Sequence, residues 1–373
     1  MNIDTEPRIV EFSSADTFHR RWLSAALRVD LDDVPGTVLN MRALRAFDLA
    51  PTRYPIHRVV RCAARGTVLA LFDDLALHSG FAAQRLGSGS LFLDGPGVLA
   101  ILKGSPKTHY TSCTFTFWTE TPERAVEVEA VLLAIVGERR MREETFTVDW
   151  RFQGGDGGLT GVSFEELVDP ELLDEAYPGL NQPVAAFIER YLAAPETVLI
   201  VQGPPGTGKT RLVRAILGAL SRRMDGRGSV LYTADRRALE NDRIFMEFLT
   251  EEHDAFVVED ADHILASRAN GNLDMHRFLA IADGIVRARG RKILFTTNLP
   301  NVGDIDEALL RPGRCFANVR TRALRRTEAA SLLRRICGGE VELFDGLMNR
   351  LLQDGASSVT LAAIYQSLPR ELR

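Results

Sequence analysis

The sequence predicts an α/β fold: a doubly wound parallel sheet, followed by a helical lid and preceded by a smaller α+β domain. The main observation is that short apolar runs alternate with helical segments in the second half of the chain. This alternation is typical of parallel strands that helices cover on both faces. A second observation is the glycine-rich stretch Gln153–Gly158, whose composition is that of a flexible linker. We therefore expect three domains, at residues 1–155, 156–320 and 321–373.

The composition is that of an ordinary globular protein. The 373 residues include 45 Lys and Arg against 50 Asp and Glu, which gives a formal net charge of −5. This mildly acidic balance argues against nucleic acid as the main partner, although a local basic face is compatible with it. No apolar run approaches the roughly 18–20 residues of a membrane helix, and the first residues do not resemble a secretory signal. The four cysteines are scattered along the chain, with neither metal-binding spacing nor a paired pattern. We therefore expect free thiols, as in proteins of a reducing compartment. We therefore expect a cytoplasmic protein that does not associate with a membrane.

Residues 1–155 carry no motif that we can connect to a reaction, so we expect an α+β recognition domain. Amphipathic helices are expected over residues 18–28 and 122–136, and Thr121 can cap the second of them. β-Branched and aromatic residues predict five strands. These strands cover residues 67–72, 90–93, 98–103, 110–118 and 144–152.

The remaining apolar runs predict the parallel sheet. They cover residues 198–202, 229–234, 255–260, 292–298 and, more weakly, 317–320. From about residue 321 the pattern is helical and indicates a small lid. Ligands of such sheets bind beyond the carboxyl ends of the strands, so polar motifs at those ends are candidates for the site.

The first of these strands leads into Gly203-Pro-Pro-Gly-Thr-Gly-Lys209-Thr210, which has the G-x-x-x-x-G-K-[ST] pattern of a phosphate-binding loop. Its glycines let backbone N–H groups converge on phosphate oxygens, and the next helix directs the positive end of its dipole there. Lys209 is expected to reach the β- and γ-phosphates and Thr210 to ligate Mg²⁺. The expected nucleotide contacts are Gly203, Pro204, Pro205, Gly206, Thr207, Gly208, Lys209, Thr210 and Arg211.

An apolar strand ends in carboxylates about fifty residues further on. Adjacent strand residues point to opposite faces, so Glu259 and Asp260 cannot perform the same task. We expect Glu259 to face the metal, through water, and Asp260 to activate the attacking water, with Asp262 as an auxiliary acid. The alternative is a solvated acidic turn without function.

Two further motifs follow. Asn298 ends the next strand, where its carboxamide can bind both the γ-phosphate and the attacking water. Arg311 and Arg314 flank a Pro-Gly turn downstream, and we expect them to serve the nucleotide of a neighbouring subunit. The alternative is two surface arginines in a loop.

In combination, these four motifs resemble the Walker A, Walker B, sensor 1 and arginine-finger elements of an AAA ATPase, over residues 175–370. The acids run Glu-Asp here, whereas most AAA proteins have Asp-Glu. Residues 278–284 resemble a Leu-Leu-Asn-x-x-Asp-Gly segment of the mitochondrial Rieske-protein translocase branch, except that Ala280 replaces the Asn. The likeness to that branch does not extend to a transmembrane anchor. The resemblance implies ATP as the nucleotide, a homo-oligomeric ring of six or seven subunits, and active sites between neighbours.

The family's threading members carry an aromatic-hydrophobic-glycine pore loop between the second and third strands. This chain has no glycine after an aromatic residue there, so its candidates to face a pore are Asp242, Arg243 and Phe245. We expect an ATP hydrolase that remodels, translocates or assembles a protein partner bound by the N-terminal domain. The alternatives are a nucleic-acid motor or loader, and a slow switch in which ATP only controls assembly.

Overall fold

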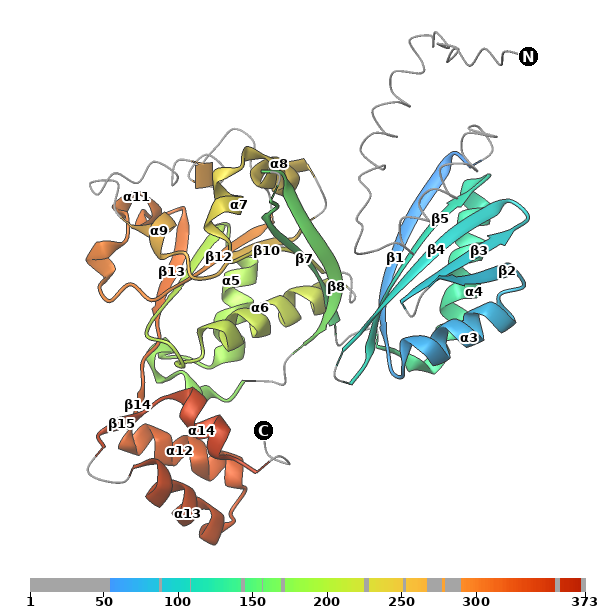
Figure 1. Cartoon of the computed structure of the whole chain (residues 1–373). Coiled ribbons are helices and arrows are strands. Elements are labelled where there is room, and N and C mark those ends of the chain that lie inside the picture. Colours follow the sequence, from blue (N-terminus) through green and yellow to red (C-terminus); the bar gives the residue numbers. More distant parts are fainter. Residues whose placement is uncertain are drawn as a thin grey trace, which may run out of the picture. The chain divides into compact units, whose positions relative to one another are not determined.

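The computed structural model describes residues 54–86, 89–107, 109–141, 145–155, 157–168, 172–224, 228–250, 253–266, 277–278, 290–352 and 356–369 (Figure 1). The expected helix over residues 18–28 lies outside these residues, as do residues 279–284 of the translocase-like segment. The chain divides into two compact units, Met1–Met141 and Arg142–Arg373. In the described residues, no helix combines the length and the apolar character needed to cross a membrane.

The first unit is an antiparallel sheet with two helices packed on one face. The strands follow the order β2-β3-β4-β5-β1-β6. Leucines and phenylalanines of β3, β4 and β5 form one core with the apolar sides of α3 and α4. The elements are β1 (Ile56–Ala64), α3 (Val68–His78), β2 (Ala82–Leu86), β3 (Ser90–Gly95), β4 (Val98–Pro106), β5 (Thr111–Thr119), α4 (Pro122–Val136) and β6 (Arg140–Met141).

The expected strand over residues 67–72 is wrong, because this segment is the first part of helix α3. Its buried residues are Val68, Leu71, Phe72 and Leu75, a spacing that belongs to one face of a helix and not to a strand. The Thr67 hydroxyl also accepts a hydrogen bond from the backbone N–H of Ala70 (3.2 Å) and so caps the helix.

The second unit contains the predicted parallel sheet, in the order β13-β9-β12-β11-β10-β7-β8. All neighbours from β13 to β7 are parallel, and β8 alone is antiparallel to its partner. The strands are β7 (Thr145–Gln153), β8 (Leu159–Leu167), β9 (Val198–Gln202), β10 (Ser229–Thr233), β11 (Ala255–Val258), β12 (Lys292–Thr297) and β13 (Cys315–Arg320). The fold class predicted from the sequence is therefore confirmed.

The boundary between the units differs from the expected one near residue 155. Strand β7 pairs with β10 of the parallel sheet, so residues 145–153 belong to the second unit. The glycine-rich stretch Gln153–Gly158 is not a linker between domains. It is the turn of the β7–β8 hairpin, in which the Gly154 N–H donates to the Gly158 carbonyl (2.8 Å).

Helices cover both faces of this sheet (Figure 1). On one face, α5 (Val184–Ala193) and α6 (Lys209–Arg223) bury their apolar sides against β9, β11 and β12. On the other face lie α7 (Arg236–Glu240), α8 (Asp242–Thr250), α9 (Asp262–Leu265) and α11 (Glu307–Leu310). The expectation that Phe245 faces a pore is wrong, since its ring is buried against Phe256 and Phe278.

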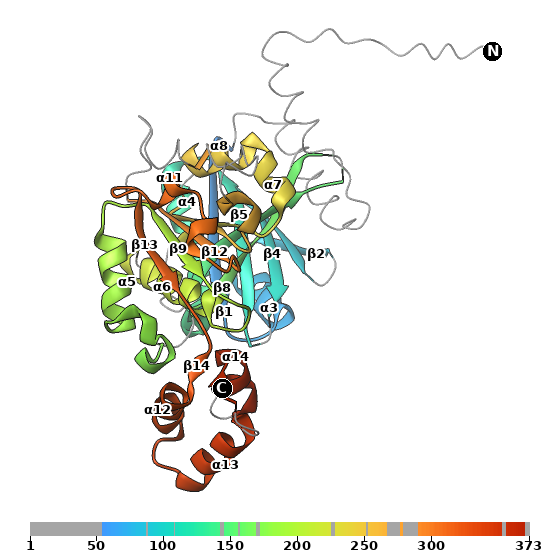
Figure 2. The same ribbon diagram turned by 90° about the vertical axis from the view of Figure 1, so that its left-hand side faces the viewer.

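The chain ends in the predicted helical lid, which Figures 1 and 2 show as a small bundle below the sheet. Its helices are α12 (Arg326–Cys337), α13 (Val341–Leu351) and α14 (Leu361–Ser367). The short strands β14 (Leu324–Arg325) and β15 (Ser358–Val359) pair at its base. Buried lid leucines share one apolar core with α5 and α6, which fixes the lid beside the start of α6.

Candidate active site

The loop Gly203–Thr210 connects the end of β9 to the start of α6, at the carboxyl edge of the sheet. A Cβ atom at Gly203 would lie 2.3 Å from the Thr321 carbonyl oxygen, so only glycine fits there. Gly208 has φ +92°, and a Cβ on it would lie 2.7 Å from Leu361 Cδ1 of the lid. These two positions explain the glycines by close approach and by backbone conformation.

Lys209 lies at the centre of the site with a buried side chain. Its ammonium group donates to the Gly203 carbonyl (2.8 Å) and to Asn298 Oδ1 (2.8 Å). Burial lowers the pKa of Lys209 below that of an ordinary lysine, while the negative charges of Asp260, Asp262 and Glu259 act in the opposite direction. A phosphate beside this ammonium group would accept a hydrogen bond from it and would supply a negative charge that favours its protonated form.

Thr210 and Glu259 form a second pair, in which the Thr210 hydroxyl donates to Glu259 Oε1 (2.7 Å). Thr210 opens α6, whereas Glu259 follows β11 directly. A hydroxyl and a carboxylate provide the oxygen ligands that Mg²⁺ prefers, and Mg²⁺ usually retains several waters. The two side chains therefore fit a magnesium ion beside the phosphates.

Asn298 joins Lys209 to the second acid. Its amide nitrogen donates to Asp260 Oδ1 (3.0 Å), while its oxygen accepts from Lys209. Asp262 supports this arrangement because it accepts hydrogen bonds from the Asn298 backbone N–H (2.8 Å) and the Thr297 hydroxyl (2.5 Å). The backbone of Asp260 has φ +49°, a conformation that residues other than glycine rarely adopt. Such backbone conformations are often found at functional sites.

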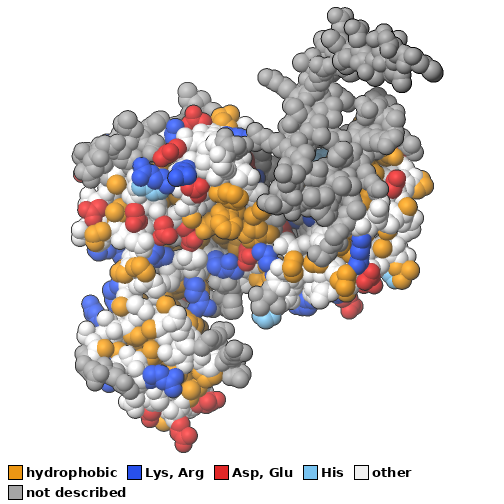
Figure 3. Space-filling view, in the orientation of Figure 1, with side chains coloured by type: hydrophobic (Ala, Val, Ile, Leu, Met, Phe, Trp, Pro, Cys, Tyr) orange, Lys and Arg blue, Asp and Glu red, His pale blue; other side chains and the backbone are white. Residues whose placement is uncertain are grey.

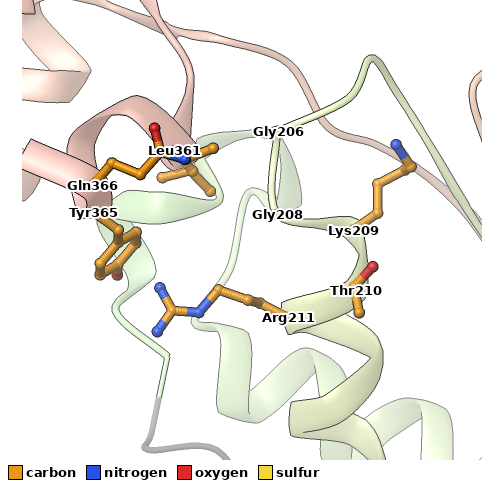
Figure 4. A pocket seen from close by; sticks show the side chains of 9 residues that line it. Gly206, Gly208, Lys209, Thr210, Arg211, Leu361, Tyr365 and Gln366 are labelled. Atoms are coloured by element: carbon orange, nitrogen blue, oxygen red, sulfur yellow. The ribbon is translucent and has the colours of Figure 1, made fainter. Parts of the chain in front are cut away.

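A cavity of about 500 Å³ lies between the loop and the lid (Figure 4). Figure 4 shows the Arg211 guanidinium turned toward Tyr365 of α14, and its Cζ is 3.9 Å from the centre of that ring. The Ala362 N–H donates to the Gly206 carbonyl (2.9 Å), which ties the lid to the loop. A pocket of this size suits a nucleotide. Its lining includes residues of α14 that the sequence analysis missed: Leu361, Ala362, Tyr365 and Gln366.

Arg311 and Arg314 are not part of this arrangement. The Arg314 carbonyl accepts from the Val198 N–H (3.1 Å), which places it at the amino end of β9. The phosphate loop follows the opposite end of this strand, at a distance of about 15 Å for five extended residues. Arg311 is exposed, and the Arg314 guanidinium donates to the Ala308 carbonyl (2.7 Å). The turn that carries both arginines thus lies at the end of β9 opposite to the phosphate loop.

The sequence analysis also missed Tyr232 of β10. Its hydroxyl donates to Glu259 Oε2 (2.8 Å). The only signal in the sequence is that Tyr232 lies at the end of a predicted strand, and the pairing of that strand with β11 is visible only in the fold.

The parallel sheet, the glycine-rich loop before α6 and the acids beyond β11 define a nucleoside triphosphatase of the P-loop class. Residues 199–322 match the family model "ATPase family associated with various cellular activities (AAA)". This part of the chain is thus an AAA ATPase domain, the domain of a family of ATP hydrolases.

Known relatives of the matched region perform different tasks. A Bifidobacterium dentium "AAA ATPase forming ring-shaped complexes" is 24% identical over 48% of this chain and 36% of its own length. The "ATP-dependent zinc metalloprotease FtsH" of Acidothermus cellulolyticus is 31% identical over 43% and 27%. The "Mitochondrial chaperone BCS1" of Danio rerio is 28% identical over 56% and 52%. The chain therefore spans between about a quarter and about half of these relatives.

Proposed function

We propose that this chain hydrolyses ATP in a ring of six or seven copies of itself and uses the energy to remodel, translocate or assemble a protein partner. The observation that carries the proposal is the distance between Arg314 and the phosphate loop of the same subunit. Arginines that stabilise a transferring phosphoryl group must reach it, so these two are useful only in a neighbour's site. A relative that forms ring-shaped complexes supports this assembly.

In the proposed mechanism, a water molecule attacks the γ-phosphorus of ATP in line with the departing ADP. Asp260 orients this water, and Asn298 holds Asp260 through its amide nitrogen (3.0 Å). Lys209 and the N–H groups at the start of α6 compensate the negative charge of the phosphates. Thr210 and Glu259 would hold Mg²⁺, which would supply positive charge beside the phosphates. Arg311 and Arg314 come from the adjacent subunit.

Mixed rings test the shared site. Lys209→Ala removes nucleotide binding and Arg314→Ala removes the group given to the neighbour, so either variant alone should be inactive. Rings assembled from both variants should regain part of the ATPase activity, because some interfaces then combine an intact loop with an intact arginine. Arg335→Ala, on the exposed side of α12, is a matched control that should stay active. If mixing restores no activity, the site does not lie between subunits.

The protein partner can be trapped on a variant that binds ATP without hydrolysing it. Asp260→Asn preserves the shape of the side chain but removes the charge that orients water. A pull-down with this variant should retain the partner in the presence of ATP, whereas Lys209→Ala should not. Equal recovery by both variants would show that capture does not depend on nucleotide.

Our proposal for its location is the cytoplasm. Each of Cys62, Cys113, Cys315 and Cys337 is a free thiol, as expected in a reducing compartment. Localisation of the tagged chain in cell fractions would test this.

A further inference from the structure

Glu259 receives two hydrogen bonds from two different elements. The Thr210 hydroxyl of α6 donates to Oε1 (2.7 Å), and the Tyr232 hydroxyl of β10 donates to Oε2 (2.8 Å). Each carboxylate oxygen therefore has its own donor. The first contact belongs to the metal site described above. The second has no part in the chemistry described so far, although it acts on the same side chain.

The parallel register of the sheet explains why Tyr232 lies there. Tyr232 is level with Val257 of β11, and Glu259 follows Val257 by two residues, on the same face of the sheet. On the other side, Tyr232 is level with Trp150 of β7. The two rings meet edge to face, with centroids 5.9 Å apart at 77°, which restricts the phenol ring.

The β7–β8 hairpin supplies the apolar surroundings of Tyr232. A cavity of about 270 Å³ lies between this hairpin and α6, and Tyr232 and Glu259 both line it. Figure 3 shows hydrophobic side chains gathered over β7 and β8, and those exposed there include Trp150, Phe152 and Val162. A tyrosine hydroxyl is protonated at neutral pH, so Tyr232 can donate to Glu259.

The hydrogen bond from Tyr232 restricts the Glu259 side chain, and this restriction matters because Glu259 is a glutamate and not an aspartate. Its side chain has one more rotatable bond than an aspartate, so its carboxylate can adopt more positions. A hydrogen bond from Thr210 to Oε1 alone would leave the Glu259 carboxylate free to rotate and Oε2 free to change position. The donor on Oε2 removes that freedom before the metal arrives. Partners that orient a metal-binding side chain typically contribute about 10- to 100-fold to metal affinity.

We propose that Tyr232 is a positioning residue for the magnesium site: its hydroxyl holds Glu259 in the orientation that binds the ion beside Thr210. The proposal rests on the assignment of Glu259 to the metal in the proposed function. In this role Tyr232 acts through its hydrogen bond to Glu259.

Metal affinity in the full-length chain tests the proposal. Tyr232→Phe retains the ring against Trp150 and removes only the hydroxyl. In the presence of saturating ADP, the dissociation constant for Mn²⁺, measured by electron paramagnetic resonance, should rise about 10-fold or more. Two quantities should not change: the affinity for ADP in EDTA and the melting temperature. A merely structural role would alter these two and leave the affinity for Mn²⁺ intact.

Matched variants make the result specific. Tyr191→Phe also removes a buried phenol hydrogen bond, to the Thr197 carbonyl (2.9 Å), but far from Glu259, and it should leave the affinity for Mn²⁺ unchanged. In Glu259→Gln the affinity should fall, and adding Tyr232→Phe should weaken it little further, because both changes act on one carboxylate.

The outcomes separate the two assignments. If Glu259→Gln weakens Mn²⁺ binding and Tyr232→Phe does not, the positioning role is wrong while the metal assignment stands. If neither variant weakens it, Glu259 does not hold the metal and both assignments fail. A parallel loss of ADP affinity in EDTA would also overturn the positioning role, since the defect would then concern the whole site.

Discussion

The Asn298 side chain hydrogen-bonds to both the Lys209 ammonium group and the Asp260 carboxylate. Because it joins Lys209 to Asp260, its loss should disturb the attacking water more than the bound nucleotide. For Asn298→Ala we expect kcat to fall about 100-fold, the effect of removing one oriented donor, and KM for ATP to change little. Steady-state kinetics measure both.

The control for this experiment is Asn301→Ala, three residues later in an exposed turn, where the side chain bonds only to Asp304 among the described residues. This variant should keep nearly full activity. A larger change in KM than in kcat for Asn298→Ala would indicate that Asn298 serves binding and not the chemical step.

Single residues were predictable from the sequence where a motif fixes their place along the chain. Thr210 lies at the start of the helix after the glycine-rich loop, whereas Glu259 and Asn298 follow strand ends, and the fold brings them together at one edge of the sheet. Tyr232 and Tyr365 could not be predicted in the same way. Tyr232 reaches Glu259 only through the register of β10 on β11, and Tyr365 reaches Arg211 only because the lid packs beside α6.

At the scale of elements, the strand over residues 144–152 was predicted, but its sheet was not. Alternation shows that a strand is half-buried, whereas the choice of partner depends on contacts distant in sequence. One such contact is the ion pair between Arg151 of β7 and Glu247 of α8 (2.6 Å), a helix that covers one face of the parallel sheet. The prediction of a strand over residues 67–72 was wrong for a different reason. It relied on the content of β-branched and aromatic residues, whereas the apolar residues have the spacing of a helix.

The contact between Lys292 and helix α5 predicts a dependence of stability on pH. Lys292 is the first residue of β12. Its ammonium group donates to the carbonyls of Ala194 (2.7 Å) and Glu196 (3.1 Å), just after α5 ends. Burial lowers the pKa of Lys292 from 10.5 to about 8. Between these values the unfolded chain binds more protons than the native one, so this residue makes the free energy of unfolding rise with pH.

The measurement is urea unfolding at several pH values from about 8 to 10.5, in the wild type and in Lys292→Met. The difference in unfolding free energy between the two proteins should shift in favour of the wild type as pH rises through this range. The variant removes the titrating group, so other ionisations cancel in the difference. A difference that is independent of pH would show that Lys292 keeps an ordinary pKa in the native state.

Two glycines of the lid should respond to alanine with opposite signs. Gly346 lies inside α13 without a positive φ, and a Cβ atom there would meet no packed neighbour within 4 Å, so Gly346→Ala should stabilise the helix by about 0.5–1 kcal/mol. Gly338 ends α12 with φ +58°, and Gly338→Ala should cost about 1 kcal/mol. Chemical denaturation of both variants tests the pair, and equal signs would contradict the assigned end of α12.

At the scale of the whole molecule, the two units have separate apolar cores. One core joins α3 and α4 to the antiparallel sheet, and two others lie on the faces of the parallel sheet. The sequence predicted three domains, at residues 1–155, 156–320 and 321–373, and it placed β7 in the first because a glycine-rich turn resembles a linker. A hairpin turn and a linker need the same residues, and only strand pairing distinguishes them.

The separation of the cores predicts how nucleotide acts on thermal unfolding. Because the phosphate loop, the acids and the lid all belong to residues 142–373, a bound nucleotide should stabilise that unit alone. At a ligand concentration of about 100 Kd the gain is about 2.7 kcal/mol. Scanning calorimetry should therefore show two transitions, of which ADP with Mg²⁺ raises only one. In Lys209→Ala neither transition should move, and a shift of both in the wild type would show that the units unfold as one.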